Sequence, residues 1–117
     1  MYIYIIECSN GSLYTGVAKD IEKRLSEHFY HKKQSAKYTK SHQMTSLKAL
    51  WKTETKQDAM KLEYRIKTLT HSQKLELILQ TKTLVELFLN TINPESYEFI
   101  DSKKQELIMQ KITNKED

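Results

Sequence analysis

The apolar positions at the start of the chain predict a β-hairpin. Two runs rich in β-branched and aromatic residues, Tyr2–Cys8 and Leu13–Val17, flank a short polar segment that contains the pair Asn10-Gly11. An Asn-Gly pair between two such runs is typical of a tight turn that needs positive φ. The start of the chain therefore predicts two adjacent antiparallel strands.

Three residues of this hairpin carry further information. Tyr4 and Tyr14 fall on neighbouring strands, so their phenols can project from one face of the sheet toward a common point. Tyrosine is also an ordinary strand residue, and a packing role stays open for both. Gly16 lies inside the second strand, which indicates a bulge or a place where another group approaches the backbone closely.

The next segment predicts an amphipathic helix over residues 21–30, with Asp20 as its N-cap. Arg24 and His28 are four residues apart and lie on one stripe beside the apolar face. We expect both side chains to emerge at the rim of the surface on which the helix packs. The apolar face consists of Ile21, Leu25 and Phe29.

A third strand and a second helix follow an irregular basic loop over residues 31–45. Partial alternation over residues 47–53 predicts the strand. The helix starts near Thr55, where Asp58 in the third position resembles a capping box. Glu63 flanks the apolar stripe of this helix instead of lying opposite to it. The stripe consists of Ala59, Leu62, Ile66 and Leu69.

A third helix is expected over residues 73–80, with Ser72 as its cap and Leu75, Ile78 and Leu79 facing inward. The β-β-α-β-α plan ends there, which predicts an α/β (α+β) domain over residues 1–80. Residues 81–117 are expected to form a helical C-terminal extension, which is broken at Asn93-Pro94 and ends in a lysine- and glutamate-rich helix.

Charge favours an anionic partner. The chain has 117 residues, a net charge of +4 and a pI near 9.1, and residues 19–42 are rich in lysine and histidine. Lysines interleaved with tyrosines suit a nucleic-acid backbone and its bases, but a solvated helix face and loop would have the same composition. The candidate nucleic-acid-binding residues are Lys32, Lys33, Lys37, Tyr38 and Lys40.

Several other classes of protein are disfavoured. No apolar run approaches the length that spans a bilayer, and the N-terminus lacks the layout of a signal peptide. The single cysteine, Cys8, excludes an intramolecular disulfide and a multi-cysteine metal site, which fits a reducing compartment. Cys8 lies in an apolar strand, where packing is its expected role. We therefore expect a cytoplasmic protein.

The predicted elements direct five polar side chains toward the hairpin face. These are Tyr4, Tyr14, Arg24, His28 and Glu63. One carboxylate can hold one Mg²⁺ or Mn²⁺, an arginine can clamp a phosphate, and a phenol beside both can orient water or accept its proton. The set is complete for metal-assisted cleavage of a phosphodiester.

Each of these residues also has a structural interpretation. Glu63 can form an ion pair with Lys67 four residues on, and Arg24 can be a surface residue. A structural zinc site that includes His28 and the nearby His31 and His42 is disfavoured, because the spacings do not match a recognised ligand pattern.

Five segments, in this order, resemble the GIY-YIG nuclease superfamily and its small stand-alone bacterial branch, often called URI-type. The paired motif is Tyr2-Ile3-Tyr4 and, after nine further residues, Tyr14-Thr15-Gly16. Residues 20–28 resemble the first helix of that family, including its arginine and the histidine one turn later. The other matching segments are residues 35–40, 62–67 and 69–78.

The resemblance covers about residues 1–80 and implies a three-stranded antiparallel sheet flanked by helices. It implies that Glu63 is the metal ligand and Arg24 the cation that stabilises the phosphate. Tyr4 and Tyr14 would orient or activate the water, with His28 assisting.

The chain departs from the family pattern at three positions. Tyr2 stands in place of the glycine of the first motif, Thr15 in place of the isoleucine of the second, and Val17 in place of a lysine found in some members. Both phenols are retained. The asparagine that larger members add after the metal-binding glutamate has no match.

The resemblance implies an endonuclease that hydrolyses DNA with one divalent metal ion and acts on single-stranded or branched substrates in repair or recombination. The alternative is a nucleic-acid-binding or adaptor protein that kept the fold and lost catalysis. A third alternative is an interaction module that docks through residues 81–117 on a partner or on its own copy. The carboxylate near the expected phosphate site favours the enzyme, because pure binding would not need it.

Overall fold

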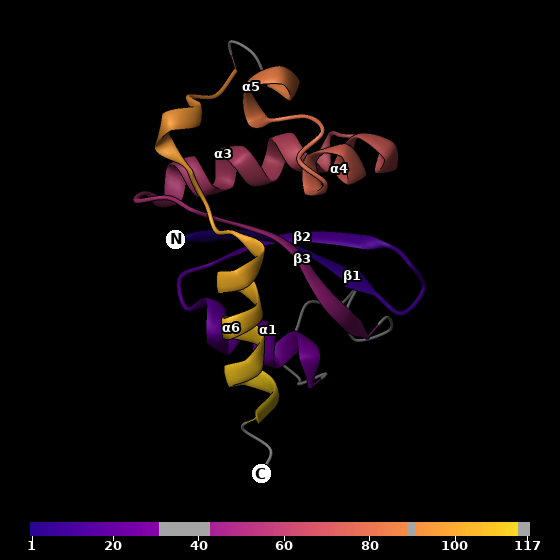
Figure 1. Ribbon diagram of the computed structural model, residues 1–117. Coiled ribbons are helices and arrows are strands. Elements are labelled where there is room, and N and C mark those ends of the chain that lie inside the picture. Colours follow the sequence, from indigo (N-terminus) through magenta and orange to yellow (C-terminus); the bar gives the residue numbers. More distant parts are fainter. Residues whose placement is uncertain (31–42, 89–90, 115–117) are drawn as a thin grey trace.

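The computed structural model describes residues 1–30, 43–88 and 91–114, which form an antiparallel sheet between two layers of helices (Figure 1). The strand order is β2-β1-β3-β4. The strands are β1 (Tyr2–Cys8), β2 (Leu13–Ala18), β3 (Met44–Lys52) and β4 (Glu98–Phe99). The mixed α+β fold is confirmed, but the sheet has four strands where the sequence predicted three, because β4 from the C-terminal third pairs with the end of β3.

The predicted hairpin is confirmed, and so is the positive φ expected in its turn. Gly11 has φ +82°, and its amide donates to the Cys8 carbonyl at 2.8 Å. The Cys8 amide in turn donates to the Ser12 carbonyl at 2.9 Å. These bonds define a three-residue loop in which Gly11 takes the left-handed position, so the Asn10-Gly11 pair needs one positive φ and not two.

One face of the sheet is covered by α1 (Ile21–Phe29) and α6 (Ser102–Thr113), which lie below the sheet in Figure 1. Asp20 caps α1 as predicted, because its carboxylate accepts from the Lys23 amide at 3.1 Å. The Tyr30 hydroxyl donates to the Ile112 carbonyl at 2.8 Å and ties the end of α1 to the end of α6. The buried core of this layer consists of Tyr4, Ile6, Cys8, Ile21, Leu25, Met44, Leu50, Ile100 and Ile112.

The opposite face is covered by α3 (Lys56–Lys67), α4 (His71–Ile78) and α5 (Leu84–Leu87), which lie above the sheet in Figure 1. Thr55 caps α3 as predicted. A single-turn 3₁₀ helix, Pro94–Ser96, leads into β4. The buried core of this layer consists of Ile3, Ile5, Ala49, Trp51, Ala59, Leu62, Ile66, Leu77, Leu84 and Phe88.

Two element predictions are wrong in detail. β3 begins at Met44, inside the segment that was expected to be loop, because its first residues pair with the end of β1. The cap of α4 is Thr70 and not Ser72, since Thr70 forms a reciprocal capping box with Gln73. The buried residue of α4 is Leu77, whereas Leu75 and Leu79 are exposed. In a helix this short, the surface on which the helix packs decides which apolar residues are buried.

The C-terminal third packs on both layers of the domain. Leu84 and Phe88 join the core beneath α3 and α4, and Ile112 joins the core beneath α1. The division of the chain at residue 80 stays a prediction.

Candidate active site

Tyr4 lies in the sheet directly opposite Gly16, and its ring occupies the space above that glycine. The two residues pair across β1 and β2. A Cβ added to Gly16 would lie 2.6 Å from Cζ of Tyr4, which is far inside van der Waals contact. Gly16 is therefore the point of close approach that the sequence indicated, and the approaching group is the Tyr4 phenol.

His28 completes a cluster of three rings with the two tyrosines. The Tyr4 hydroxyl is 2.8 Å from Nε2 of His28 in a buried hydrogen bond. The ring centroids of Tyr4 and Tyr14 both lie 5.6 Å from that of His28, and 6.4 Å from each other. The expectation that His28 emerges at a rim is wrong: the side chain is fully buried because both phenol rings pack against it.

Arg24 does lie at the rim, and it is held by two partners. Its Nη1 is 3.2 Å from Oε1 of Glu27, one helical turn away. A side-chain hydrogen bond also joins Arg24 to Tyr4. Glu27 was missed by sequence reasoning, although its three-residue spacing from Arg24 on one helix was a usable signal. Because Glu27 is itself buried, its ion pair fixes the direction of the guanidinium.

The protonation states of the cluster follow from burial and from these contacts. Arginine only donates hydrogen bonds, so the Tyr4 oxygen accepts from Arg24, and the Tyr4 hydroxyl shares a second hydrogen bond with Nε2 of His28. Burial raises the pKa of Tyr4 to about 12, against the lowering effect of the Arg24 hydrogen bond. Burial, with the positive charge of Arg24, lowers the pKa of His28 to about 4. At neutral pH the pair is therefore a neutral phenol bonded to a neutral imidazole.

Glu63 belongs to α3, on the other layer of the domain. Its negative charge is the smallest of the causes that raise the pKa of Tyr4. The Glu63 side chain is 19% exposed, and its Oε2 lies 3.4 Å from Nζ of Lys67. The ion pair that the sequence left open is thus present.

The donor set around Glu63 fits a hard divalent cation. It offers one carboxylate at a partly open position, and Mg²⁺ takes one or two protein carboxylates and completes its shell with water and phosphate oxygens. Within residues 1–30, 43–88 and 91–114, no group of three or more His, Cys, Asp and Glu side chains could enclose a metal ion. A cation at Glu63 would therefore need oxygens from water or from a substrate, and it would replace the Lys67 ammonium.

A groove of about 390 Å³ adjoins Arg24 at the start of α1. Lys19 and Lys23 line it beside Arg24, while the carboxylates of Asp20 and Glu27 are engaged in the helix cap and the Arg24 ion pair. The groove thus continues the positive charge of Arg24 along the surface. The predicted nucleic-acid-binding residues Lys32, Lys33, Lys37, Tyr38 and Lys40 lie outside the described residues.

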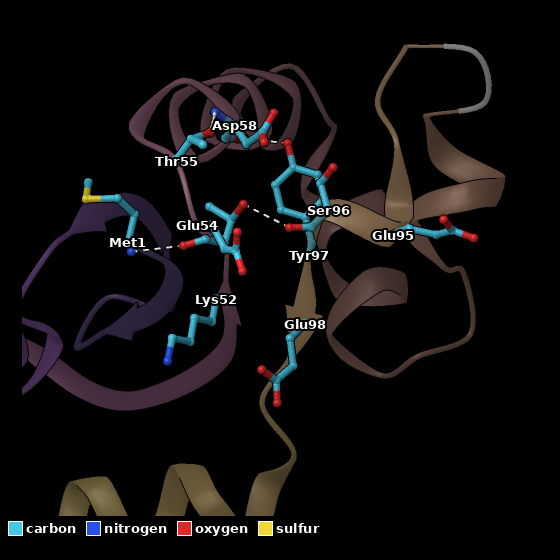
Figure 2. Close-up of a pocket in the computed structure, with 10 residues that line it drawn as sticks. Met1, Lys52, Glu54, Thr55, Asp58, Glu95, Ser96, Tyr97 and Glu98 are labelled. Atoms are coloured by element: carbon cyan, nitrogen blue, oxygen red, sulfur yellow. Dashed lines mark hydrogen bonds between the residues drawn. The ribbon is translucent and has the colours of Figure 1, made fainter.

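A larger cavity of about 750 Å³ shares no lining residue with the cluster (Figure 2). Its wall carries four carboxylates, those of Glu54, Asp58, Glu95 and Glu98. Residues that line this cavity form hydrogen bonds with one another. Figure 2 shows one of these bonds, in which the Tyr97 hydroxyl donates to the Asp58 carbonyl at 2.7 Å. The negative charge of this cavity disfavours phosphate binding there.

The helices of the described residues are all too short or too polar to cross a membrane.

Comparisons with known proteins identify the family of the chain. A family model described as the GIY-YIG catalytic domain matches residues 1–76. A UPF0213 protein of Staphylococcus saprophyticus is 51% identical over 77 residues, which is 66% of this chain and 92% of that protein. A UPF0213 protein of Staphylococcus aureus is 48% identical over the same length and with the same coverage.

A solved structure is also similar. The solution NMR structure of a UPF0213 protein from Bacillus halodurans is 33% identical and covers 78% of this chain and 97% of its own, with a TM-score of 0.43.

The antiparallel sheet with helices on both faces, and the tyrosine hairpin at its edge, define an α+β domain. The chain belongs to the GIY-YIG catalytic domain family, as the five sequence segments predicted.

Proposed function

We propose that this protein is a divalent-metal-dependent endonuclease that hydrolyses DNA phosphodiester bonds at the cluster of Tyr4, Tyr14, Arg24, His28 and Glu63. The observation that carries the proposal is the buried hydrogen bond between the Tyr4 hydroxyl and Nε2 of His28, flanked by Arg24. A neutral phenol held by a neutral histidine and a cation presents a hydroxyl in a fixed position, which can orient a water molecule.

Tyr4 and His28 would position the attacking water. With the pKa of Tyr4 at about 12 and that of His28 at about 4, neither the phenolate nor the imidazolium is populated at neutral pH. The Tyr4 hydroxyl would therefore orient the water by hydrogen bonding and would not take its proton. Tyr14, whose ring lies against His28 and Tyr4, would orient the water.

Arg24 would stabilise the charge that develops on phosphorus. Its guanidinium is preorganised by the ion pair with Glu27, so little reorientation is needed when a phosphate arrives. Lys19 and Lys23 in the adjoining groove would neutralise the neighbouring phosphates of the same strand.

Glu63 would hold the divalent metal. A bound Mg²⁺ or Mn²⁺ would lower the pKa of water and offset the negative charge of the phosphate. Hard oxygen ligands of this kind suit Mg²⁺ and Mn²⁺ equally, so the chemistry of the site does not distinguish them.

Cleavage of labelled single-stranded, duplex and branched DNA in Mg²⁺ or Mn²⁺ tests the proposal. We expect the parent protein to cleave at least one of these, and Glu63→Gln and Arg24→Ala each to lose about 100-fold or more in rate. Glu54→Gln, which neutralises an exposed carboxylate of the acidic cavity, is the matched control and should cleave like the parent.

Two outcomes would contradict the proposal. Binding of DNA without cleavage by the parent in either metal would identify an adaptor that kept the fold. Cleavage that persists in Glu63→Gln would remove Glu63 from the metal site.

A further inference from the structure

One face of α3 continues outward from Glu63 and is open to solvent. Residues 60, 63, 64 and 67 follow the i, i+3, i+4, i+7 spacing, so Met60, Glu63, Tyr64 and Lys67 share one side of the helix. Lys56, one turn before Met60, belongs to the same side. We call the exposed residues Lys56, Met60, Tyr64 and Lys67 the α3 platform.

The apolar members of the α3 platform are unusually exposed. Tyr64 is 65% exposed and Met60, one turn earlier, is 50% exposed. Single exposed apolar residues are normal on a protein surface, but two that are adjacent and flanked by cations are typical of a contact surface. The core side of the same helix, which consists of Ala59, Leu62 and Ile66, is fully buried. The packing of the helix therefore does not require apolar side chains at the exposed positions 60 and 64.

The charges on and beside the platform favour an anionic partner. Lys56 and Lys67 lie at its two ends, and the Arg65 guanidinium stands 5.8 Å from the centroid of the Tyr64 ring. Glu63 offsets one of these three cations through its ion pair with Lys67, which leaves Lys56 and Arg65 in excess. An aromatic face beside cations that can reach a backbone is the usual means of holding unpaired nucleotides, because each base can stack on the ring while its phosphate meets a lysine.

We infer that the α3 platform binds an unpaired nucleotide of the DNA strand next to the bond that is cut, with its base stacked on Tyr64. Duplex DNA keeps its bases stacked on each other and would leave the Tyr64 ring without a partner. The inference rests on the proposed function for the position of the cut bond at Glu63, one residue before Tyr64. It makes the platform the feature that selects single-stranded or frayed DNA.

Equilibrium binding without metal, in EDTA, tests the platform separately from catalysis. The probes are a fluorescently labelled oligonucleotide of twelve thymidines (dT12) and a duplex of equal length at low salt. We expect Tyr64→Ala to weaken dT12 binding at least about fivefold and duplex binding less than about twofold. Tyr64→Phe keeps the ring and should bind dT12 within about twofold of the parent.

Two control variants separate stacking from general effects. Leu79→Ala removes an apolar side chain that is 71% exposed on another helix, and it should change neither affinity. Lys67→Met should weaken both probes and reduce the salt dependence of binding, whereas Lys103→Met on α6 should not. A 2-aminopurine placed in the oligonucleotide should be quenched on binding to the parent and not to Tyr64→Ala.

Several outcomes would overturn the inference. The first is a Tyr64→Ala variant that binds dT12 as tightly as the parent does. The second is a Tyr64→Ala variant that loses affinity equally for dT12 and for the duplex. The third is a parent protein that binds an oligouridine more tightly than dT12. If the parent cleaves DNA and Tyr64→Ala binds and cleaves like the parent, the inference about the platform is wrong and the proposed nuclease function is still supported. Tyr64-dependent binding without cleavage in metal would support the platform and contradict the nuclease. A parent that binds no DNA would contradict both.

Discussion

The phenol ring of Tyr4 fills the space that a side chain at residue 16 would occupy, so Gly16 sets the position of Tyr4. The Tyr4 hydroxyl reaches Nε2 of His28 from that position. A glycine in the middle of an edge strand weakens the strand, and here the close approach of the phenol explains its presence.

Gly16→Ala should displace Tyr4 and impair the site. We expect a loss of about 1–3 kcal/mol in the free energy of unfolding, because the added methyl overlaps the ring. Cleavage should fall at least tenfold. Gly11→Ala is the matched control: it strains a residue with φ +82° but meets nothing within 4 Å, so urea unfolding should show a loss of about 1–2 kcal/mol with cleavage by the folded protein unchanged.

Tyr4→Phe and Tyr14→Phe should both lower the cleavage rate, by about 100-fold or more, because each removes a hydroxyl from the ring cluster. Their effects on stability should differ. Tyr4→Phe removes the buried hydrogen bond to His28 and should cost about 1–3 kcal/mol, whereas Tyr14 is only partly buried and Tyr14→Phe should cost less. Paired urea melts and cleavage assays check this. Full activity in Tyr4→Phe would rule out the proposed role of the Tyr4 hydroxyl in orienting the water.

Stability should fall as the pH drops from about 6.5 toward 4, because of His28. Its pKa is about 4 in the folded protein against 6.5 for the free side chain, so the unfolded chain binds more protons between those values. Among the described residues, Tyr4, Tyr14 and Arg24 face His28.

The expected loss between pH 7.5 and 5 is about 2 kcal/mol, read from urea melts at constant ionic strength. A His28→Gln variant should lose most of this slope. A parent whose stability is flat between these two pH values would show that His28 is not held neutral.

The hydroxyl of Thr15 is buried and has no hydrogen-bond partner in the part of the chain that the structure describes. Thr15→Val keeps the shape and removes the unsatisfied group, so it should raise the free energy of unfolding by about 1 kcal/mol. Thr53→Val is the contrasting variant, because the Thr53 hydroxyl donates to the Ser96 carbonyl at 2.8 Å and its removal should destabilise. Thermal melts of the two variants should therefore shift in opposite directions.

Ile112→Ala should show whether α6 is docked on α1 in solution. The Ile112 side chain is fully buried against the sheet, so truncation should cost about 2–4 kcal/mol. Leu107→Ala, on the same helix but 53% exposed, should cost less than about 0.5 kcal/mol. Equal, small effects for both would show that α6 is not packed as described.

The family and the α+β fold were predictable from sequence because their signals are local. The hairpin, the Asp20 cap and the stripe of Ala59, Leu62 and Ile66 each depend on residues within one or two turns of each other. β4 was not predictable, since two residues carry no periodicity and pair with β3 only after the chain has folded back.

The candidate site shows the same division. Sequence spacing identified Arg24 and His28 on one helix, but the burial of His28 depends on two rings from different strands. Glu27 escaped notice because a charged residue on a surface helix is ordinarily solvated, and its burial against Arg24 is a property of the packed helix.

The hydrogen bond between the Tyr30 hydroxyl and the Ile112 carbonyl means that changes in the C-terminal third can affect the proposed site during evolution. It connects α6 to the helix that carries Arg24 and His28 without placing any residue of α6 among the five proposed catalytic side chains. Mutations in α6 can therefore alter how firmly that helix is held while the five proposed catalytic side chains are inherited unchanged. Such mutations would adjust the proposed site gradually, whereas substitution of its own side chains would remove it in one step.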